Sequence, residues 1–233
     1  MDKKRSTVLL LHGALGTSKD LTGLSEYLKE KGYETLTFDF SGHGADTVWP
    51  NEFRIDLFAR DLDQYLKSHG LTDVAIFGYS MGGYVALYHK ANFEDSPLSN
   101  IVTYGTKFNW TPKSVAKELP LLDPDHLQEK YPHFAEALKV KHGERWKQLM
   151  RSTAHMMQHL ERLDGLTKED LHEVEIPVTL VLGDQDRMVT SEETNLTASW
   201  LHHVQVKTLT HSKHELERSN LKELAEIIVS AIE

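Results

Sequence analysis

The fold is decided by the sequence Gly78-Tyr79-Ser80-Met81-Gly82, which directly follows the apolar stretch Val74-Ala75-Ile76-Phe77. A serine between two glycines, after a buried strand and before a helix, lies on a tight turn with unusual backbone angles. A Cβ atom on either glycine would collide with the neighbouring strand and helix. The turn exposes the Ser80 hydroxyl at the tip of the sheet and directs the following N–H groups at whatever it attacks. The alternative is a serine in an ordinary strand-to-helix turn.

Short apolar stretches alternate with longer helical patterns on both sides of this turn. Such alternation is typical of an α/β protein whose mostly parallel central sheet has helices on its faces. Strands are predicted at Thr7–Leu11, Thr35–Phe40, Val74–Phe77, Ile101–Tyr104, Pro177–Leu182 and Val204–Leu209. Helices are predicted at 20–31, 53–68, 190–201 and from Asn220 onwards. We therefore expect a sheet of about six strands.

Residues 107–175 interrupt this alternation, because they carry no strand pattern. Four prolines divide the segment, and short helices are predicted at about 113–119, 125–139, 143–161 and 167–173. A structureless connection of this length is rare in a compact domain. We interpret 107–175 as an inserted helical cap on a core formed by residues 1–106 and 176–233.

Composition excludes several classes of function. The 233-residue chain has 26 Lys and Arg against 35 Asp and Glu, a formal net charge of −9, and no cysteine. An acidic chain whose only basic cluster is Lys3-Lys4-Arg5 is a poor candidate for binding nucleic acid or an anionic membrane. The apolar stretch Val8–Leu11 is too short for a signal-peptide core. We expect a soluble, cytoplasmic protein, a monomer or a homodimer, acting on a small molecule.

The exposed serine requires two further groups, because its hydroxyl is not ionised at neutral pH. A histidine takes and returns the proton, and a carboxylate fixes the tautomer of that histidine. Two carboxylates follow the strand that ends near Gly183, namely Asp184 and Asp186. Two histidines, His211 and His214, lie between the last strand and the last helix.

Four motifs in this order resemble the α/β-hydrolase fold superfamily. They are Leu10-Leu11-His12-Gly13-Ala14-Leu15, Phe38-Asp39-Phe40-Ser41-Gly42-His43-Gly44, the nucleophile elbow at 78–82, and Gly183-Asp184-Gln185-Asp186. The order of serine, then aspartate, then histidine is also the one that this fold uses. In the fullest version of the fold the His-Gly segment follows the third strand, whereas here it follows the first, so the leading hairpin is expected to be missing.

The resemblance selects among the alternatives. It implies Asp186 as the acid, with Val189 three residues further on, and leaves Asp184 to hold the loop. It implies His214, in Ser212-Lys213-His214, as the base, and leaves His211 as a loop histidine. It assigns the two backbone N–H donors of an oxyanion hole to Ala14 and Met81.

The resemblance implies a carboxylesterase-like serine hydrolase that cleaves an ester-like bond without a cofactor. The same triad occurs in the menaquinone-pathway lyases and the carbon–carbon bond hydrolases, and some proteins of this fold are non-enzymatic receptors. The lyase branch commonly carries an arginine where this chain has Tyr84, which disfavours that alternative.

The remaining candidates are assigned to structure or to the substrate pocket. His12 is expected to hold its loop, and His155 and His159, four residues apart, lack an evident third metal ligand. The stripe from Trp146 to Leu160 is expected to be mostly cap core, with part of it facing Ser80. Residues expected to contact substrate are Leu15, Tyr84, Trp110, Met156 and Val189.

Overall fold

The computed structural model describes residues 7–44 and 49–233, and the basic cluster at residues 3–5 lies outside them. The described chain contains one six-stranded sheet with the order β2-β1-β3-β4-β5-β6, in which every neighbouring pair is parallel. The strands are β1 (Thr7–Leu11), β2 (Glu34–Thr37), β3 (Val74–Tyr79), β4 (Leu98–Tyr104), β5 (Val178–Gly183) and β6 (Val204–Leu209). The expected sheet of about six strands is confirmed.

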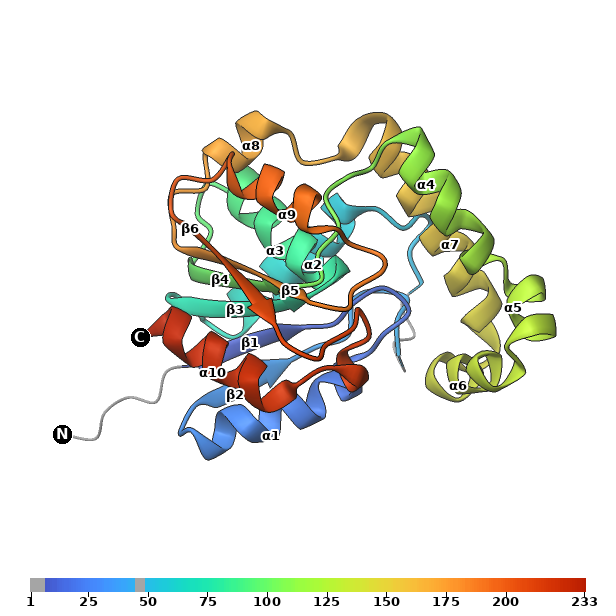
Figure 1. The fold of residues 1–233 in the computed structure, drawn as a ribbon, viewed down its shortest axis with the longest axis horizontal. Helices are drawn as coiled ribbons and strands as arrows, with labels where there is room; N and C mark the ends of the chain where they lie inside the picture. Colours follow the sequence, from blue (N-terminus) through green and yellow to red (C-terminus); the bar gives the residue numbers. More distant parts are fainter. Residues whose placement is uncertain (1–6, 45–48) are drawn as a thin grey trace.

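Helices cover both faces of the sheet (Figure 1). One face carries α1 (Thr22–Glu30) and α10 (Leu221–Ile232), and the other carries α2 (Ile55–Ser68), α3 (Met81–Asn92) and α9 (Ser191–Ala198). In β1, the side chains of Val8 and Leu10 pack in the core on the side of α1 and α10, and those of Leu9 and Leu11 pack in the core on the side of α2 and α3. Side chains of a strand alternate between its two faces in this way. Because all six strands run the same way, the loops that follow them meet at one edge.

Between β4 and β5 the chain forms helices that extend beyond that edge, on the right of Figure 1. They are α4 (Pro112–Glu118), α5 (Pro124–Lys130), α6 (Pro132–His142) and α7 (Trp146–His159), followed by α8 (Lys168–His172). The single helix predicted at 125–139 is wrong. Pro132 lacks an N–H and is favoured at the start of a helix, so α5 ends before it and α6 begins with it.

Two residues at the end of α6, Lys141 and His142, attach the helical segment to core loops. The Lys141 ammonium lies 2.8 Å from the Asp20 carboxylate. The His142 ring accepts a hydrogen bond from the Gly44 N–H at 3.0 Å through Nδ1, and its Nε2 donates to the Leu15 carbonyl at 2.9 Å.

The last helix of the predicted cap behaves differently from the others. Leu171 of α8, together with Val174, is fully buried in the core formed by α2 and α3. Helix α8 thus packs on the sheet side of the molecule (Figure 1). The division into a core of 1–106 and 176–233 and a cap of 107–175 stays a prediction. Within the described ranges, no helix is long and apolar enough to cross a membrane.

Candidate active site

Ser80 lies on a strained turn between β3 and α3. Its φ is 50° and its ψ is −113°, a region that residues with a side chain rarely adopt. A Cβ on Gly78 would collide with the backbone of Gly82 and Gly83, and one on Gly82 would lie 2.6 Å from the Leu11 carbonyl of β1. The collisions expected from the sequence are confirmed, and they explain why glycine flanks the serine.

Hydrogen bonds to β4 and to the segment after it hold this turn in place. The Ser80 N–H donates to the Tyr104 carbonyl at 2.8 Å, and the Thr106 hydroxyl donates to the Ser80 carbonyl at 3.0 Å. Met81 is the first residue of α3, so its N–H has no partner within the helix. The elbow therefore presents both a hydroxyl and a free helix terminus at the sheet edge.

The loops after β5 and β6 are joined to each other. Asp184 accepts hydrogen bonds from the N–H groups of His211 (3.0 Å) and Ser212 (2.9 Å), and the Gln185 N–H donates to the Ser212 carbonyl at 2.9 Å. Asp184 thus holds the loop, as expected, and these bonds keep its pKa below the ordinary value. His211 is exposed in the same turn, with a φ of 51°.

Asp186 and His214 form a hydrogen-bonded pair. The His214 Nδ1 lies 2.9 Å from the Asp186 Oδ2, and the Asp186 side chain is fully buried. The other carboxylate oxygen, Oδ1, accepts from the N–H groups of Met188 (2.8 Å) and Val189 (2.9 Å). Burial alone would raise the pKa of Asp186, but the His214 hydrogen bond and charge and the two backbone donors hold that pKa below its ordinary value.

This pair lies beside the serine loop, with β4 between them. Gly105, next to the residue that accepts from the Ser80 N–H, has φ +60°, and a Cβ there would lie 3.2 Å from the His214 Nδ1. The His214 ring also lies 5.7 Å from the ring of Tyr79, the residue before the serine. Within the described chain, no hydrogen bond joins the Ser80 hydroxyl to the imidazole. The aspartate and histidine are thus paired, and the residue before the serine is in ring contact with the histidine.

A small hollow opens beside Ser80. It measures about 30 Å³, enough for one or two water molecules. Its lining comes from the elbow and α3, the loops after β1, β4 and β5, the start of α2, the end of α4, and α7 with the turn that follows it. The lining residues are Ala14, Ile55, Ser80, Met81, Tyr84, Lys107, Trp110, Glu118, Met156, Met157, Leu160 and Met188.

Three of the five expected substrate contacts, Tyr84, Trp110 and Met156, line this hollow, together with the two expected oxyanion donors. Leu15 and Val189 lie elsewhere. Leu15 packs against the cap cluster around Trp146 and Met150, and Val189 is buried with its N–H on Asp186. The Tyr84 hydroxyl is already engaged, because it accepts a hydrogen bond from the Leu166 N–H at 2.6 Å.

Sequence reasoning did not single out Lys107, Glu118 or Met188. The available signal was position: Lys107 is the third residue after β4, and Met188 follows the acid two residues on. Residues just past the carboxyl ends of parallel strands meet at the ligand-binding edge of such sheets. Glu118 gave no such signal, since it lies at the end of cap helix α4.

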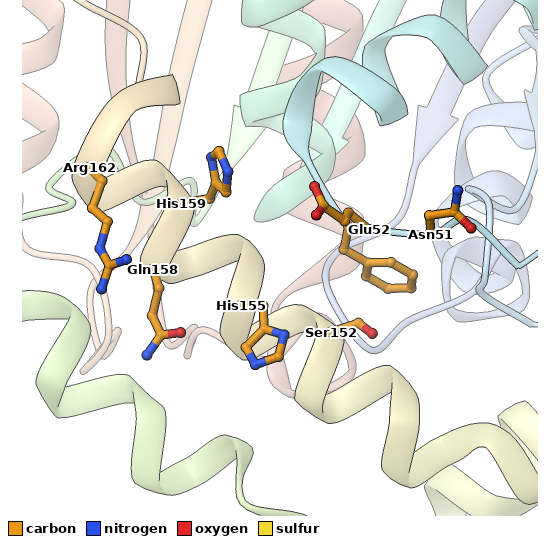
Figure 2. Close-up of a pocket in the computed structure, with 8 residues that line it drawn as sticks. Asn51, Glu52, Ser152, His155, Gln158, His159 and Arg162 are labelled. Carbon is orange, nitrogen blue, oxygen red and sulfur yellow. The ribbon is translucent and has the colours of Figure 1, made fainter.

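A larger hollow of about 340 Å³ lies on the polar side of α7 (Figure 2). His155 and Arg162 line it from α7 and the turn that follows, and Asn51 and Glu52 lie opposite them. It contains none of Ser80, Asp186 and His214. Among the residues that the structure describes, no group of three or more His, Asp or Glu side chains could hold a metal.

His12 is a structural residue, as expected. Its Nδ1 donates to the Gly13 carbonyl at 2.8 Å, and its Nε2 accepts from the Phe40 N–H at 3.1 Å. Because Nε2 accepts while Nδ1 donates, the two bonds together need the neutral ring. Complete burial lowers the pKa of His12 to about 4 and so favours that form. This neutral imidazole fixes the loop that carries Ala14 to the loop after β2.

Comparisons with known proteins agree with this geometry. The family model described as "alpha/beta hydrolase fold" matches residues 6–153. The chain belongs to the α/β hydrolase fold family.

Individual relatives are more distant. A carboxylesterase of Bacillus subtilis is 26% identical over 195 residues, which cover 81% of this chain and 75% of that protein. A 2-succinyl-6-hydroxy-2,4-cyclohexadiene-1-carboxylate synthase of Yersinia pestis is 30% identical over 95 residues, only 41% of this chain and 34% of the synthase. The structure of a thermophilic esterase from Thermogutta terrifontis superposes with a TM-score of 0.78 at 18% identity, covering 97% of this chain and 89% of that one. The chain is thus an α/β hydrolase that is distantly similar to carboxylesterases.

Proposed function

We propose that this protein is a serine hydrolase that cleaves a carboxylic ester or a related acyl bond of a small molecule. The observation that carries the proposal is the 2.9 Å hydrogen bond between Asp186 and His214, beside a serine on a strained elbow. An imidazole whose Nδ1 is held by a buried carboxylate has its Nε2 free to accept a proton. The carboxylesterase similarity over 81% of the chain supports the same chemistry.

The proposed reaction has two halves. In the first, the Ser80 oxygen bonds to the substrate carbonyl carbon, its proton passes to His214, and the backbone N–H groups of Ala14 and Met81 bind the carbonyl oxygen as it gains charge. The bond to the alcohol breaks, and the proton on His214 moves to the leaving oxygen. In the second half, water gives a proton to His214 and its oxygen bonds to the acyl carbon; the bond from that carbon to the Ser80 oxygen breaks, the proton on His214 returns to Ser80, and the acid is released.

A covalent probe tests the proposal. A fluorophosphonate that reacts with activated serines is expected to label the wild type at Ser80, and the Ser80→Ala variant is expected not to react. Ser199→Ala, which removes an exposed serine at the C-terminal end of α9, is the matched control and is expected to label fully. A folded wild type that stays unlabelled would contradict the proposed role of Ser80.

One alternative has an observation in its favour. The synthase similarity raises the lyase or carbon–carbon cleavage reaction, which uses the same three side chains. Turnover of short p-nitrophenyl esters favours the esterase, whereas turnover only of a carboxylated diketone-like substrate favours the alternative. Slow single turnover with ligand-dependent binding of a partner would instead indicate a receptor.

A further inference from the structure

A buried ion pair lies in the hollow that contains Ser80. Lys107 and Glu118 are 8% and 3% exposed, and Lys107 Nζ lies 3.8 Å from Glu118 Oε1. Removing two charges from water is costly, and a buried pair is a weak stabilising device compared with well-packed apolar side chains. A stabilising role alone therefore does not account for this pair beside the reactive serine.

The polar atoms of this cluster have unused hydrogen-bonding capacity. The Lys107 ammonium has three donors, yet its contacts are long: 3.5 Å to the Met188 carbonyl and 3.8 Å to Glu118. The buried Glu118 Oε1 accepts no hydrogen bond, and the buried indole N–H of Trp110 donates none. All three side chains line the same hollow as Ser80. The hollow thus offers two kinds of donor and one acceptor.

The backbone that carries Lys107 and Trp110 is fixed from a neighbouring helix. Glu193, in the first turn of α9, accepts hydrogen bonds from the N–H groups of Phe108 and Asn109, both at 2.6 Å. A carboxylate that binds two successive backbone donors holds this segment in one conformation. The backbone that carries the two donors is therefore fixed before any substrate arrives, as selective binding requires.

We propose that this hollow selects an acyl group that bears a hydroxyl close to the scissile carbonyl; this rests on the hydrolase function proposed above. A hydroxyl has one donor and two acceptor lone pairs, which matches Glu118 as acceptor and Lys107 and Trp110 as donors. An alkyl group would leave these buried atoms unpaired, and a carboxylate would offer no donor and would meet the charge of Glu118. The space of about 30 Å³, enough for one or two water molecules, fits a group of the size of a hydroxyl.

Four matched esters test the selection. They are the p-nitrophenyl esters of butyric, 2-hydroxybutyric and 3-hydroxybutyric acid and p-nitrophenyl hemisuccinate, all with four-carbon acyl chains. We expect kcat/KM for at least one hydroxy ester to exceed that for the butyrate by about 10- to 100-fold, the range for hydrogen bonds to charged groups. We expect the hemisuccinate to be the poorest substrate.

Variants assign the preference to the cluster. In Lys107→Met and in Glu118→Gln, the ratio of hydroxy ester to butyrate is expected to fall toward one. A role in folding alone would lower both rates together and leave the ratio unchanged. Lys113→Met, at an exposed position on the same helix as Glu118, is the control and is expected to keep the wild-type ratio. If the charge variants do not fold, Trp110→Phe removes a single donor and is expected to lower the ratio as well.

The possible failures are distinguishable. A wild type that hydrolyses the butyrate at least as well as both hydroxy esters overturns the inference and leaves the hydrolase intact. A preference for the hemisuccinate overturns it in favour of an anionic acyl group. Fluorophosphonate labelling of Ser80 without turnover of either hydroxy ester also overturns it. Absence of both labelling and turnover overturns the proposed function, and the inference with it.

Discussion

Replacing Asp186 with asparagine tests the hydrogen-bond geometry of the proposed triad. Two backbone N–H groups, from Met188 and Val189, converge on Oδ1 of the carboxylate, and His214 Nδ1 lies on Oδ2. In Asp186→Asn, the amide oxygen must take the Oδ1 position, because an NH₂ group there would face two donors. The NH₂ group therefore points at His214.

An N–H donor opposite Nδ1 selects the other tautomer of the His214 imidazole. His214 would then accept at Nδ1 and carry its proton on Nε2, the nitrogen that must take the proton from Ser80. Loss of the correct tautomer in a triad of this kind lowers kcat by about 10⁴-fold, or roughly 5 kcal/mol of transition-state stabilisation. The flipped amide, with its oxygen toward His214, would place one NH₂ against two backbone donors, so rotation does not restore activity.

The assay compares kcat and kcat/KM for p-nitrophenyl acetate in the wild type, Asp186→Asn and Asp184→Asn. Asp184→Asn is the matched control, because Asp184 also accepts two backbone hydrogen bonds but does not contact His214. We expect it to retain activity within about tenfold, while thermal unfolding shows that both variants are folded. A folded Asp186→Asn enzyme with activity close to wild type, or a larger loss in Asp184→Asn, would refute the reasoning.

Three other predictions concern the surroundings of the site. In Gly105→Ala, the new Cβ lies 3.2 Å from the His214 ring at φ +60°, so the variant should have a lower kcat and a free energy of unfolding lower by about 1–2 kcal/mol. Gly143→Ala, with φ +65° and no atom within 4 Å of the new Cβ, should lose stability but keep its kcat. Equal kcat values in the two variants would contradict this. Tyr84→Phe leaves the Leu166 N–H without its acceptor and should reduce the free energy of unfolding in urea by about 1–3 kcal/mol; a change below a few tenths would show that this bond contributes nothing. The pKa of buried His12 is lowered from 6.5 to about 4, so below about pH 6.5 the unfolded state binds more protons than the folded state. The contribution of neutral His12 to the free energy of unfolding should be fully present above pH 6.5 and decrease as the pH falls toward 4. Equal urea midpoints at pH 7 and pH 5 would exclude this linkage.

Much of the fold follows from local sequence, because buried parallel strands are short, apolar and bounded by turn residues. The strands Thr7–Leu11 and Val204–Leu209 match the prediction at both ends. The second strand ends at Thr37 rather than at Phe40. Phe38 and Phe40 are apolar because they pack against the core after the strand pairing has ended, and an apolar pattern does not distinguish these two situations.

Some residues of the candidate site were also predictable from local sequence, and others depend on how distant segments pack. A carboxylate and a histidine were predictable as a pair, because each follows a strand that ends at the same edge, but only the family resemblance selected Asp186 over Asp184 and His214 over His211. The packing of Leu15 was not predictable, because its neighbours on α6 and α7 come from a segment more than 100 residues away, and no local pattern determines how those helices dock. Glu118 was missed for the same reason. Its meeting with Lys107 depends on how α4 folds back over the sheet edge.

The unfavourable backbone of Ser80 has a consequence for how this protein loses its activity. A non-glycine residue at φ 50° persists only while its surroundings enforce it. Here the enforcing contacts come from three separate strands, β1, β3 and β4, through Leu11, Gly78 and Tyr104. If Ser80 and His214 react as proposed, loosening of these contacts lets the serine relax into an ordinary backbone conformation, away from His214. Hydrolase activity is then expected to be lost under milder denaturing conditions than helix content is.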